Sequence, residues 1–460
     1  MNMEATVPRL VIASYKGKNG KTTVTLALAY ALIRTGYRIS MFKVGPDYID
    51  PSYHSVIINK PSRNLDYVLM GNRVITRFYR YSMDSDIAII EGVSGLYDSM
   101  DGVTEVGSTA QVAKLLGAPV VLVINGERIN RTVRAIIRGL RIFDPSVRIV
   151  GAVITNVNQR QLDKLRTAVE NEGLEFLGYV PKRDDVEEVM QYRHLGLMHA
   201  GEVNTQQLMN VFRDASDFID VNKVIKIARE YSEPIEVRDY ASPNESKEVT
   251  TKLRVGILGG RVFTFYYPET IERISNFTRD LKFIDPERDQ ELGELDLLLI
   301  GGGFPEVYGE DLERNRSLRY EVRRFIDSGG YLYAECGGLM YLTNSIIHNN
   351  EEYDMVGAID ATTIMHRRPM WYGYAKARVI RDSIIGNTNT VLMGHEFHYS
   401  SLILHGNYDF VIKYERGVGV NGFDGFQINN AYAHYLHIHP DTYDVIDRIL
   451  RRILVNKTKP

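Results

Sequence analysis

The sequence predicts an α/β protein with two domains, each built on a parallel sheet. Through roughly the first 200 residues, short apolar runs alternate with longer stretches of helical pattern. That alternation is typical of a parallel sheet with helices on both faces. A second α/β pattern starts at Leu253, after a polar, charged stretch that contains two prolines. We therefore expect domains at residues 1–225 and 253–460, joined by a linker at residues 226–252.

The individual elements follow from these patterns in chain order. An apolar run at residues 9–14 predicts the first strand, and the apolar stretch at residues 22–32 predicts the first helix. Further strands of the first domain are expected at residues 38–44, 86–90, 119–125 and 148–155. In the second domain, strands are expected at residues 253–260, 296–303 and 331–334, and a helix at residues 339–342.

Composition narrows the class of protein. Of the 460 residues, 44% are apolar and 25% are charged, with a net charge of -3. We therefore expect a soluble globular protein with no nucleic-acid or membrane partner. The sequence contains neither an apolar run of the roughly 18 residues that span a membrane nor a signal-peptide pattern. The single cysteine excludes an intrachain disulfide and a cysteine-rich zinc site, which fits the cytoplasm.

A phosphate-binding loop is predicted between the first strand and the first helix, where the sequence reads K-G-K-N-G-K-T-T. Its glycines let backbone N–H groups turn toward phosphate oxygens; Lys21 would reach the β- and γ-phosphates, and Thr22 would bind Mg²⁺. Tyr15 replaces the usual first glycine, so the match is to the variant with a second lysine, Lys16. A Lys-rich surface turn is the alternative. The residues expected to bind ATP here are Lys16, Gly17, Gly20, Lys21, Thr22 and Thr23.

Carboxylates for the Mg²⁺ are expected at the carboxyl ends of nearby strands, where ligands bind in open α/β sheets. Glu91 ends the apolar run D-I-A-I-I-E. Asp47 lies in F-K-V-G-P-D-Y-I-D-P, shortly after Lys43 at a strand end. Asp50, before a proline, is equally well explained by turn chemistry. The candidate metal ligands are therefore Thr22, Asp47 and Glu91.

The lone cysteine, Cys336, lies in G-G-Y-L-Y-A-E-C-G-G-L-M-Y-L. An apolar strand precedes it, two glycines allow a sharp turn, and a helix is expected to follow. A cysteine on such a turn has its sulfur exposed, and the helix N-terminus favours the thiolate, which is the nucleophilic form. The alternative is a small buried hydrophobic residue.

A thiolate nucleophile needs a base and an oxyanion hole. His437 in A-H-Y-L-H-I-H-P is the strongest candidate for the base, with His434 and His439 as competitors. A metal cluster of histidines is the weaker alternative, because H-E-F-H at residues 395–398 shows no sign of a helix. The expected oxyanion donors are the backbone N–H groups of Gly301, Gly302, Gly303 and Gly337.

Together these motifs resemble the cobyrinic acid a,c-diamide synthase family. Further shared strings are E-G-V-S-G-L-Y-D, S-T-A-Q-V-A-K, R-H-L-G-L, G-H-E-F-H-Y-S and Y-L-H-I-H. They occur in the family's order from about Val11 to His439. The resemblance implies a P-loop NTPase-type parallel-sheet domain akin to dethiobiotin synthetase, followed by a class I glutamine amidotransferase α/β domain.

The resemblance also implies a reaction. ATP, with Mg²⁺, would phosphorylate the a and c acetate carboxylates of cobyrinic acid or a related tetrapyrrole, and ammonia from L-glutamine would displace the phosphate. Cys336 and His437 match the nucleophile and the base, and Asn156 matches an adenine-contacting position. Arg193 and His194 match the R-H-L-G-L loop, where a packing role is equally open. The residues implied to face the macrocycle or the phosphorylated intermediate are Lys43, Asp47, Tyr48 and Asp98.

The sequence departs from the patterns of related proteins in two places. Many class I glutaminases carry an acid two residues after the histidine, where this chain has His439. The branch that this chain resembles also lacks that acid, so a Cys-His dyad is expected and the orientation of His437 must come from elsewhere. Lys16, Lys18 and Tyr15 replace a Ser-Gly type loop, and Lys16 is typical of partition-type ATPases.

Two other functions stay open on the sequence. One is the a,c-diamidation of another tetrapyrrole, such as nickel sirohydrochlorin. The other is a partition-like ATPase switch with a decayed glutaminase domain, which only Lys16 favours. A homodimer is an assembly state that the sequence leaves open.

Overall fold

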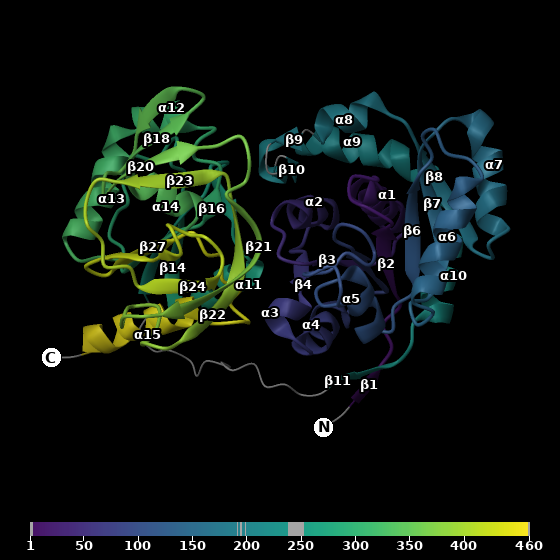
Figure 1. Cartoon of the computed structure of the whole chain (residues 1–460), viewed down its shortest axis with the longest axis horizontal. Coiled ribbons are helices and arrows are strands. Elements are labelled where there is room, and N and C mark those ends of the chain that lie inside the picture. The colour runs from purple at the N-terminus through teal and green to yellow at the C-terminus, as the bar shows by residue number, and fades with distance from the viewer. Residues whose placement is uncertain (1–2, 191, 194–195, 198, 238–252, 459–460) are drawn as a thin grey trace. The chain divides into compact units, whose positions relative to one another are not determined.

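The computed structural model describes residues 3–190, 192–193, 196–197, 199–237 and 253–458. The chain separates into two compact units, Met1–Ser242 and Pro243–Pro460 (Figure 1), and each unit holds one of the two expected α/β sheets. The predicted linker at residues 226–252 is partly structured. It begins inside helix α10 (Val221–Tyr231) and includes strand β11 (Ile235–Val237), while its residues 238–252 lie outside the described residues.

The first unit is organised by a sheet of seven parallel strands in the order β4-β3-β5-β2-β6-β7-β8. Strand β2 lies inside the sheet, where Val11 pairs with Ile90 of β5 and Val120 of β6. The five strands predicted in this domain are all present. The strands are β2 (Arg9–Ser14), β3 (Ile39–Val44), β4 (Arg63–Leu65), β5 (Ile87–Glu91), β6 (Val120–Asn125), β7 (Ile149–Val157) and β8 (Glu175–Pro181).

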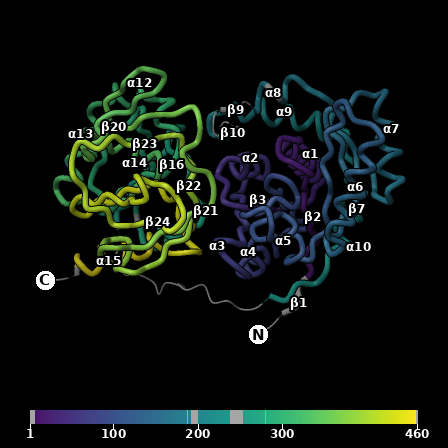
Figure 2. The backbone as a smooth tube through the Cα atoms, viewed as in Figure 1, coloured from purple at the N-terminus to yellow at the C-terminus, as the bar shows by residue number. Residues whose placement is uncertain are grey.

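Helices cover both faces of this sheet (Figure 2). On one face, buried apolar side chains from the sheet form a single cluster with α1, α2, α8, α9 and α10. On the other, α6 and α7 pack against each other. The remaining helix bounds are α1 (Lys21–Arg34), α2 (Ile49–Ile58), α3 (Tyr67–Met70), α4 (Arg73–Ser82), α5 (Thr109–Leu115), α6 (Thr132–Phe143), α7 (Gln159–Glu170), α8 (Asp184–Val189) and α9 (Thr205–Ser216).

Short elements complete the first unit. Strand β1 (Met3–Ala5) pairs antiparallel with β11, and β9 (Tyr192–Arg193) pairs antiparallel with β10 (Gly196–Leu197). A 3-10 turn, η1, covers Ala200–Glu202. Several helices begin at a side chain that accepts a hydrogen bond from the first turn, which satisfies an otherwise unpaired backbone N–H. These caps are Ser108, Asn158, Asn204 and Asp220.

The second unit is built on a sheet in the order β14-β12-β15-β17-β27-β26, parallel except for the last pair. One face packs against α12, α13 and α14 and the other against α11 and α15. The strands are β12 (Leu253–Leu258), β14 (Thr278–Ile284), β15 (Leu297–Ile300), β17 (Tyr331–Glu335), β26 (Phe426–Ile428) and β27 (Ala431–His434). The helices are α11 (Pro268–Phe277), α12 (Gly309–Arg314), α13 (Arg316–Asp327), α14 (Gly337–Leu342) and α15 (Val445–Thr458).

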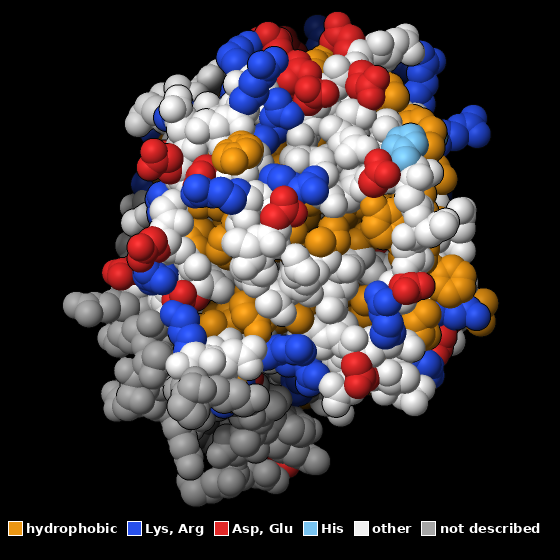
Figure 3. Space-filling view, turned by 90° about the vertical axis from the view of Figure 1, so that its left-hand side faces the viewer, with side chains coloured by type: hydrophobic (Ala, Val, Ile, Leu, Met, Phe, Trp, Pro, Cys, Tyr) orange, Lys and Arg blue, Asp and Glu red, His pale blue; other side chains and the backbone are white. Residues whose placement is uncertain are grey.

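Smaller sheets flank this core, in the orders β19-β18-β20-β23, β22-β21-β24-β25 and β13-β16. One face of the second unit carries interspersed basic and acidic side chains among scattered apolar ones (Figure 3). None of the helices in the described ranges is both long and apolar enough to cross a membrane. The strands are β13 (Phe263–Phe265), β16 (Gly302–Gly303), β18 (Thr343–His348), β19 (Glu351–Asp354), β20 (Ile359–Met365), β21 (Trp371–Val379), β22 (Val391–His398), β23 (Ser400–Leu404), β24 (Ile412–Arg416) and β25 (Phe423–Asp424).

Arg9 is a buried charge that ties the first unit together. Its side chain is 0% exposed, at the start of β2. The guanidinium donates to the carbonyl oxygens of Val7 (2.8 Å) and Leu116 (2.6 Å), and also to that of Glu233. These acceptors come from separate parts of the chain, and the buried carbonyls have their hydrogen bonds satisfied by one side chain.

We predict that Arg9→Met destabilises the protein by about 2 to 4 kcal/mol, because it removes the donor to the buried carbonyl oxygens of Val7 and Leu116. Calorimetric unfolding of the full chain measures the loss. The matched control is Arg34→Met, which removes an exposed ion pair with Asp217 (2.6 Å) and should cost less than about 1 kcal/mol. Equal losses in the two variants would contradict the role given to Arg9.

Candidate functional site

The phosphate loop lies where the sequence predicts, between β2 and α1. It turns through two residues with positive φ, Lys18 (59°) and Gly20 (85°). A Cβ on Gly20 would also lie 3.2 Å from Cγ2 of Thr155, so the loop passes close to β7. Asn19 Nδ2 donates to the Ser14 hydroxyl (2.8 Å), and the Thr155 hydroxyl donates to the Asn19 carbonyl (3.0 Å). These contacts fix the loop at the carboxyl end of the sheet.

Lys21 and Thr22 begin α1 and point toward the end of β5. The buried Lys21 ammonium donates to the Ser94 carbonyl (2.5 Å). Burial, with the neighbouring Lys43 ammonium, lowers the pKa of Lys21 to about 8. The Thr22 hydroxyl donates to Glu91 Oε1 (2.7 Å). A buried cation at a helix N-terminus is suited to a bound anion, because the anion would restore the lost solvation.

Glu91 and Lys43 form the centre of a buried ionic cluster at the ends of β5 and β3. Lys43 Nζ lies 3.1 Å from Glu91 Oε1 and 3.9 Å from Asp47 Oδ2, and it contacts Asp50 directly. Burial alone would lower the pKa of Lys43, but these carboxylates raise it above its ordinary value. Burial alone would raise the pKa of Glu91, but Lys43, His54 and Thr22 lower it. Both groups are therefore charged at neutral pH.

His54 belongs to this cluster and was not among the residues predicted from the sequence. Its side chain is 0% exposed. Nε2 lies 2.7 Å from Glu91 Oε2, and Nδ1 lies 3.0 Å from the Ser62 hydroxyl. The feature of the sequence that could have identified His54 is its place on α2. It lies one helical turn after Asp50, so both side chains are on one face of the helix. His54 holds the second oxygen of Glu91 while Thr22 holds the first.

The other predicted residues of the first unit are placed as follows. Asp47 Oδ1 accepts from the N–H groups of Ile49 (2.8 Å) and Asp50 (3.1 Å), so this oxygen starts helix α2 and only Oδ2 faces Lys43. Asp98 is exposed, and its Oδ2 accepts from the Gly95 N–H (2.6 Å). Tyr48 is half-buried directly before α2.

Further predicted positions border the loop. Thr23 lies 3.9 Å from the sulfur of Met190, and Gly17 has open space around it. Asn156, near the end of β7, has a φ of 53° and directly follows the residue that contacts the loop. Lys16 lies over the Tyr15 ring, with Nζ 5.8 Å from its centroid. His194 and the side chain of Arg193 lie outside the described residues.

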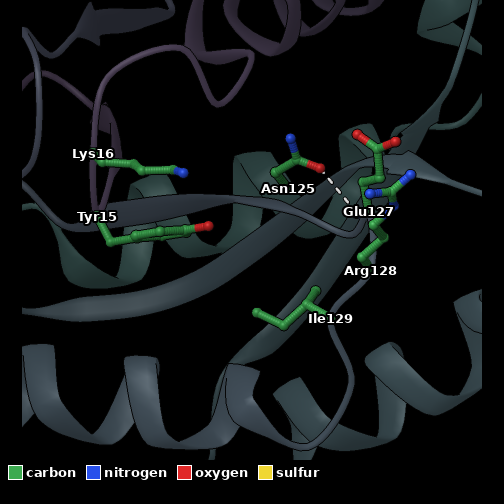
Figure 4. A pocket seen from close by; sticks show the side chains of 6 residues that line it. All are labelled: Tyr15, Lys16, Asn125, Glu127, Arg128 and Ile129. Carbon is green, nitrogen blue, oxygen red and sulfur yellow. Dashed lines mark hydrogen bonds between the residues drawn. The ribbon is translucent and has the colours of Figure 1, made fainter.

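A pocket of about 360 Å³ opens beside the loop (Figure 4). Tyr15 and Lys16 line it from the end of β2, and Asn125 and the segment after β6 line it from the other side. The Asn125 side-chain oxygen accepts from the Glu127 N–H (2.9 Å), and Lys16 extends toward Asn125 in the view. Lys16 and Arg128 bring two positive charges to the pocket against one negative charge from Glu127.

The Cys336 turn has the predicted strand-turn-helix form. Cys336 directly follows β17 and directly precedes α14, with φ 49° and ψ -102°. Its N–H donates to the His434 carbonyl (2.7 Å). A Cβ on Gly338 would lie 2.5 Å from the Ile300 carbonyl oxygen, so glycine is required for α14 to pack against β15. Positive φ at a residue that is not glycine marks a backbone held under strain, as is common at catalytic sites.

The exposure and the protonation state of Cys336 both differ from the prediction, because the residue is buried. The side chain is 5% exposed, and burial raises the pKa of its thiol, with the Glu306 carboxylate adding to the effect. The Gly337 N–H at the helix start acts in the other direction and is outweighed. The resting group is therefore a thiol rather than the thiolate that the helix N-terminus was expected to favour.

The glycine loop of the predicted oxyanion hole, residues 301–303, lies against the Cys336 turn. A Cβ on Gly337 would be 3.0 Å from the Gly303 nitrogen. A Cβ on Gly303, with φ 155°, would be 1.9 Å from the Val262 carbonyl oxygen, so only glycine fits there. Gly301 needs a correction, because its N–H donates to the Tyr266 hydroxyl (2.6 Å) and is already used. Gly302, Gly303 and Gly337 stay as candidates.

Of the three histidines considered as the base, His437 lies against this glycine loop. A Cβ on Gly302 would be 2.6 Å from its Cε1 atom. Backbone hydrogen bonds with His395 hold His437 in place (3.0 and 2.9 Å), and the two rings stack at 4.8 Å. His434 Nε2 instead lies 2.9 Å from the Tyr333 hydroxyl, and His439 Nδ1 accepts from the Asp441 N–H (3.0 Å).

Comparisons with known proteins match both units. A family described as the CobQ/CobB/MinD/ParA nucleotide binding domain matches residues 10–195, and one described as the CobB/CobQ-like glutamine amidotransferase domain matches residues 254–445. The chain is 42% identical to a cobyrinate a,c-diamide synthase of Archaeoglobus fulgidus, over 94% of each chain. It is 36% identical to that of Methanosarcina acetivorans, over 95% of this chain and 93% of the relative. Identity to the Methanocaldococcus jannaschii protein of that name is 34%, over 94% and 96%.

We predict slow alkylation of native Cys336 at neutral pH. Because burial raises the pKa of this thiol, the reactive thiolate is scarce at pH 7 and becomes more abundant as the pH rises toward the raised value. Iodoacetamide should react with the native chain at least about 10-fold more slowly than with the urea-unfolded chain, since one pKa unit is a tenfold change in thiolate. The chain has one cysteine, so the signal reports this residue alone. Native reactivity equal to that of the unfolded chain at pH 7 would contradict the raised pKa.

Proposed function

The chain belongs to the cobyrinate a,c-diamide synthase family, and we propose how its two sites divide the chemistry of that family. The protein uses ATP and carries out glutamine-dependent amidation in corrinoid biosynthesis. The observation that carries the division of labour is the strained turn at Cys336 in the second unit, whose next residue, Gly337, lies against the glycine loop. The site at this turn is suited to release ammonia from glutamine. The phosphate loop of the first unit is suited to activate the carboxylate that accepts the ammonia.

Ammonia release would proceed at Cys336 by covalent catalysis. His437 accepts the thiol proton, and the sulfur attacks the side-chain amide carbon of glutamine. The N–H groups of Gly303 and Gly337 stabilise the negative charge that develops on the oxygen. His437 then gives its proton to the departing ammonia, and water hydrolyses the thioester to glutamate and restores the thiol. A thiol with a raised pKa makes the proton acceptor necessary in each cycle.

Acceptor activation would take place at the phosphate loop. A carboxylate oxygen of an acetate side chain attacks the γ-phosphorus of ATP, which forms an acyl phosphate and releases ADP. Lys21 and Lys16 place positive charge where the phosphate oxygens gain negative charge. Ammonia attacks the acyl carbon, phosphate leaves, and the amide forms. The a and c acetates react in turn, so each amide consumes one ATP and one glutamine.

Thr22, Glu91 and Asp47 would hold the Mg²⁺ that accompanies ATP. The Thr22 hydroxyl and Glu91 Oε1 already adjoin, at 2.7 Å, which fits two ligands of one ion. Among the described residues, no group of three or more His, Cys, Asp or Glu side chains gathers as a metal site. Mg²⁺ bound with a nucleotide needs only one or two carboxylates, because phosphate and water supply the other ligands. When bound, it would neutralise charge on the phosphates.

The acceptor would bind near the ionic cluster. Tyr48 precedes α2, and Asp98 shapes the loop whose Ser94 carbonyl accepts from Lys21, so both border the reacting region. Lys43 is buried among carboxylates, which supports a role in holding Glu91 and Asp47 in place. Lys16 and Arg128 give the neighbouring pocket an excess of positive charge, which suits the phosphates of ATP or the carboxylates of the tetrapyrrole.

The alternative of an ATPase switch with a decayed glutaminase domain predicts loss of the second site. The positive φ of Cys336, the close glycine contacts and the buried His437 argue instead for a working site. A cytoplasmic location is part of the proposal, supported by the single cysteine. A homodimer stays a prediction.

We predict that Cys336→Ala abolishes glutamine-dependent amidation, by at least about 1000-fold, because the covalent intermediate cannot form. Amidation supported by an ammonium salt should stay within about twofold of wild type, since it bypasses the thiol. Both rates are measured as amide product by mass spectrometry, with glutamine hydrolysis followed in parallel. Ammonia release from glutamine by the variant would exclude Cys336 as nucleophile. Failure of ammonium to restore amidation would exclude the division into two sites.

A second prediction concerns His54. His54→Ala removes the partner of Glu91 Oε2, so the Mg²⁺ concentration for half-maximal ammonium-dependent amidation should rise about 10- to 100-fold. Calorimetry should show a matching loss of Mg²⁺-ATP affinity, while glutamine hydrolysis is retained. Ser62→Ala removes only the outer contact to Nδ1 and should give a smaller change in the same direction. Unaltered Mg²⁺ dependence in His54→Ala would count against Glu91 as a metal ligand held by His54.

A further inference from the structure

The base of the second unit needs a group that fixes its ring, and the sequence supplies none at the usual place. Two residues after His437 lies His439 instead of an acid. In the structure, the His439 ring contacts other groups: Nδ1 accepts from the Asp441 N–H (3.0 Å), and Nε2 lies 3.7 Å from Glu269 Oε2. The group that orients His437 has to come from another element.

Glu335 is in the required place. It is the last residue of β17 and directly precedes Cys336. Its Oε2 lies 3.4 Å from His437 Nδ1, at the outer limit of hydrogen bonding. The His437 side chain is 2% exposed and that of Glu335 is 12% exposed, so water competes little for this contact. Glu335 and Cys336, which are adjacent at the end of β17, thus present a carboxylate and a thiol next to each other.

We propose that Glu335 is the positioning residue of His437, holding the imidazole through Nδ1 so that Nε2 serves the Cys336 thiol. A carboxylate on one ring nitrogen fixes the tautomer and the orientation of the ring and stabilises the imidazolium that forms when the ring takes a proton. The acid therefore comes from the residue before the nucleophile, rather than from the residue two after the base. This inference rests on the proposed role of Cys336 and His437.

Glu335 is itself held in position. The Tyr333 hydroxyl donates to Oε1 (2.7 Å), and the Ile438 N–H lies 3.4 Å from the same oxygen. Register pairing places Glu335 opposite His434 of β27, whose Nε2 lies 2.9 Å from the Tyr333 hydroxyl. One carboxylate oxygen is therefore anchored to the sheet while the other faces His437. A rigidly held partner loses little freedom when it orients the base.

The charge state of Glu335 agrees with this role. Burial alone would raise its pKa, but His437, His434 and the Tyr333 hydroxyl lower it below the ordinary value. Glu335 is thus a carboxylate at neutral pH. The neighbouring His395 has a pKa well below its ordinary value, because of burial and of His437, so it packs against the base as a neutral ring.

The test is a double-mutant cycle on glutamine hydrolysis with Glu335→Gln and His437→Ala. We expect Glu335→Gln to lower kcat about 10- to 100-fold, below the roughly 10²- to 10⁴-fold that a general base contributes, with KM for glutamine within about twofold. In the His437→Ala background it should cause no further loss, because a positioning residue acts only through the group that it positions. A merely structural residue would give additive losses.

Controls separate this inference from the proposed function. Glu352→Gln changes a carboxylate of the same unit that accepts from Ser345 (2.6 Å), and it should hydrolyse glutamine like wild type. Glu335→Asp keeps the charge but withdraws it by one methylene, and it should recover part of the lost kcat. Ammonium-dependent amidation and the unfolding temperature of each variant verify that the chain is folded.

The outcomes are distinct. Additive losses in the cycle, or wild-type kcat in Glu335→Gln, would overturn the role of Glu335 while Cys336→Ala still abolishes hydrolysis. Hydrolysis that survives in Cys336→Ala would instead overturn the proposed function of the site. If Glu335→Gln unfolds, the cycle is run with Glu335→Asp, for which full additivity with His437→Ala would equally overturn the inference.

Discussion

Both sites depend on one constraint, the sharp turn by which the chain leaves the carboxyl end of a strand within its sheet and enters a helix. In the first unit the turn passes through Gly20 at φ 85°, and in the second through Cys336 at φ 49°. Left-handed backbone costs a residue with a side chain about 1 to 2 kcal/mol. At Cys336 the same turn brings the start of α14 against the glycine loop, where a Cβ on Gly337 would lie 3.0 Å from the Gly303 nitrogen.

The two sites differ in how the charges around them are compensated. Around Lys43 and Glu91, opposite charges and His54 compensate one another, so the two groups stay ionised although they are buried. Around Cys336, the nearest charges are carboxylates, and they add to the effect of burial by keeping the thiol protonated. The first arrangement is suited to anion and metal binding at rest. In the second, a thiol that acts as the proposed nucleophile needs a base to remove its proton, so the orientation of His437 becomes important.

Local pattern sufficed to predict the strands of the first unit and to propose candidate residues for both sites. The apolar runs gave the strands of the first unit, because a strand buried on both faces has to be apolar throughout. The phosphate loop, Glu91 and Cys336 were predictable from their place at strand ends, since parallel strands bring their carboxyl ends to one edge. His54 was not predicted from the sequence, because its partner Glu91 lies 37 residues away in the chain and no local spacing indicates that contact.

The sequence by itself determined the family and the order of the two folds, and it predicted Cys336 as the nucleophile, because contiguous stretches of the chain carry these signals. Tertiary structure alone decided three further points. It lowered the pKa of Glu91 and raised that of Cys336, it removed Gly301 from the oxyanion donors, and it brought Glu335 to His437. The physical reason is common to all three: burial and contact between distant segments set hydrogen bonds and charge, and neither exists until the sheets assemble.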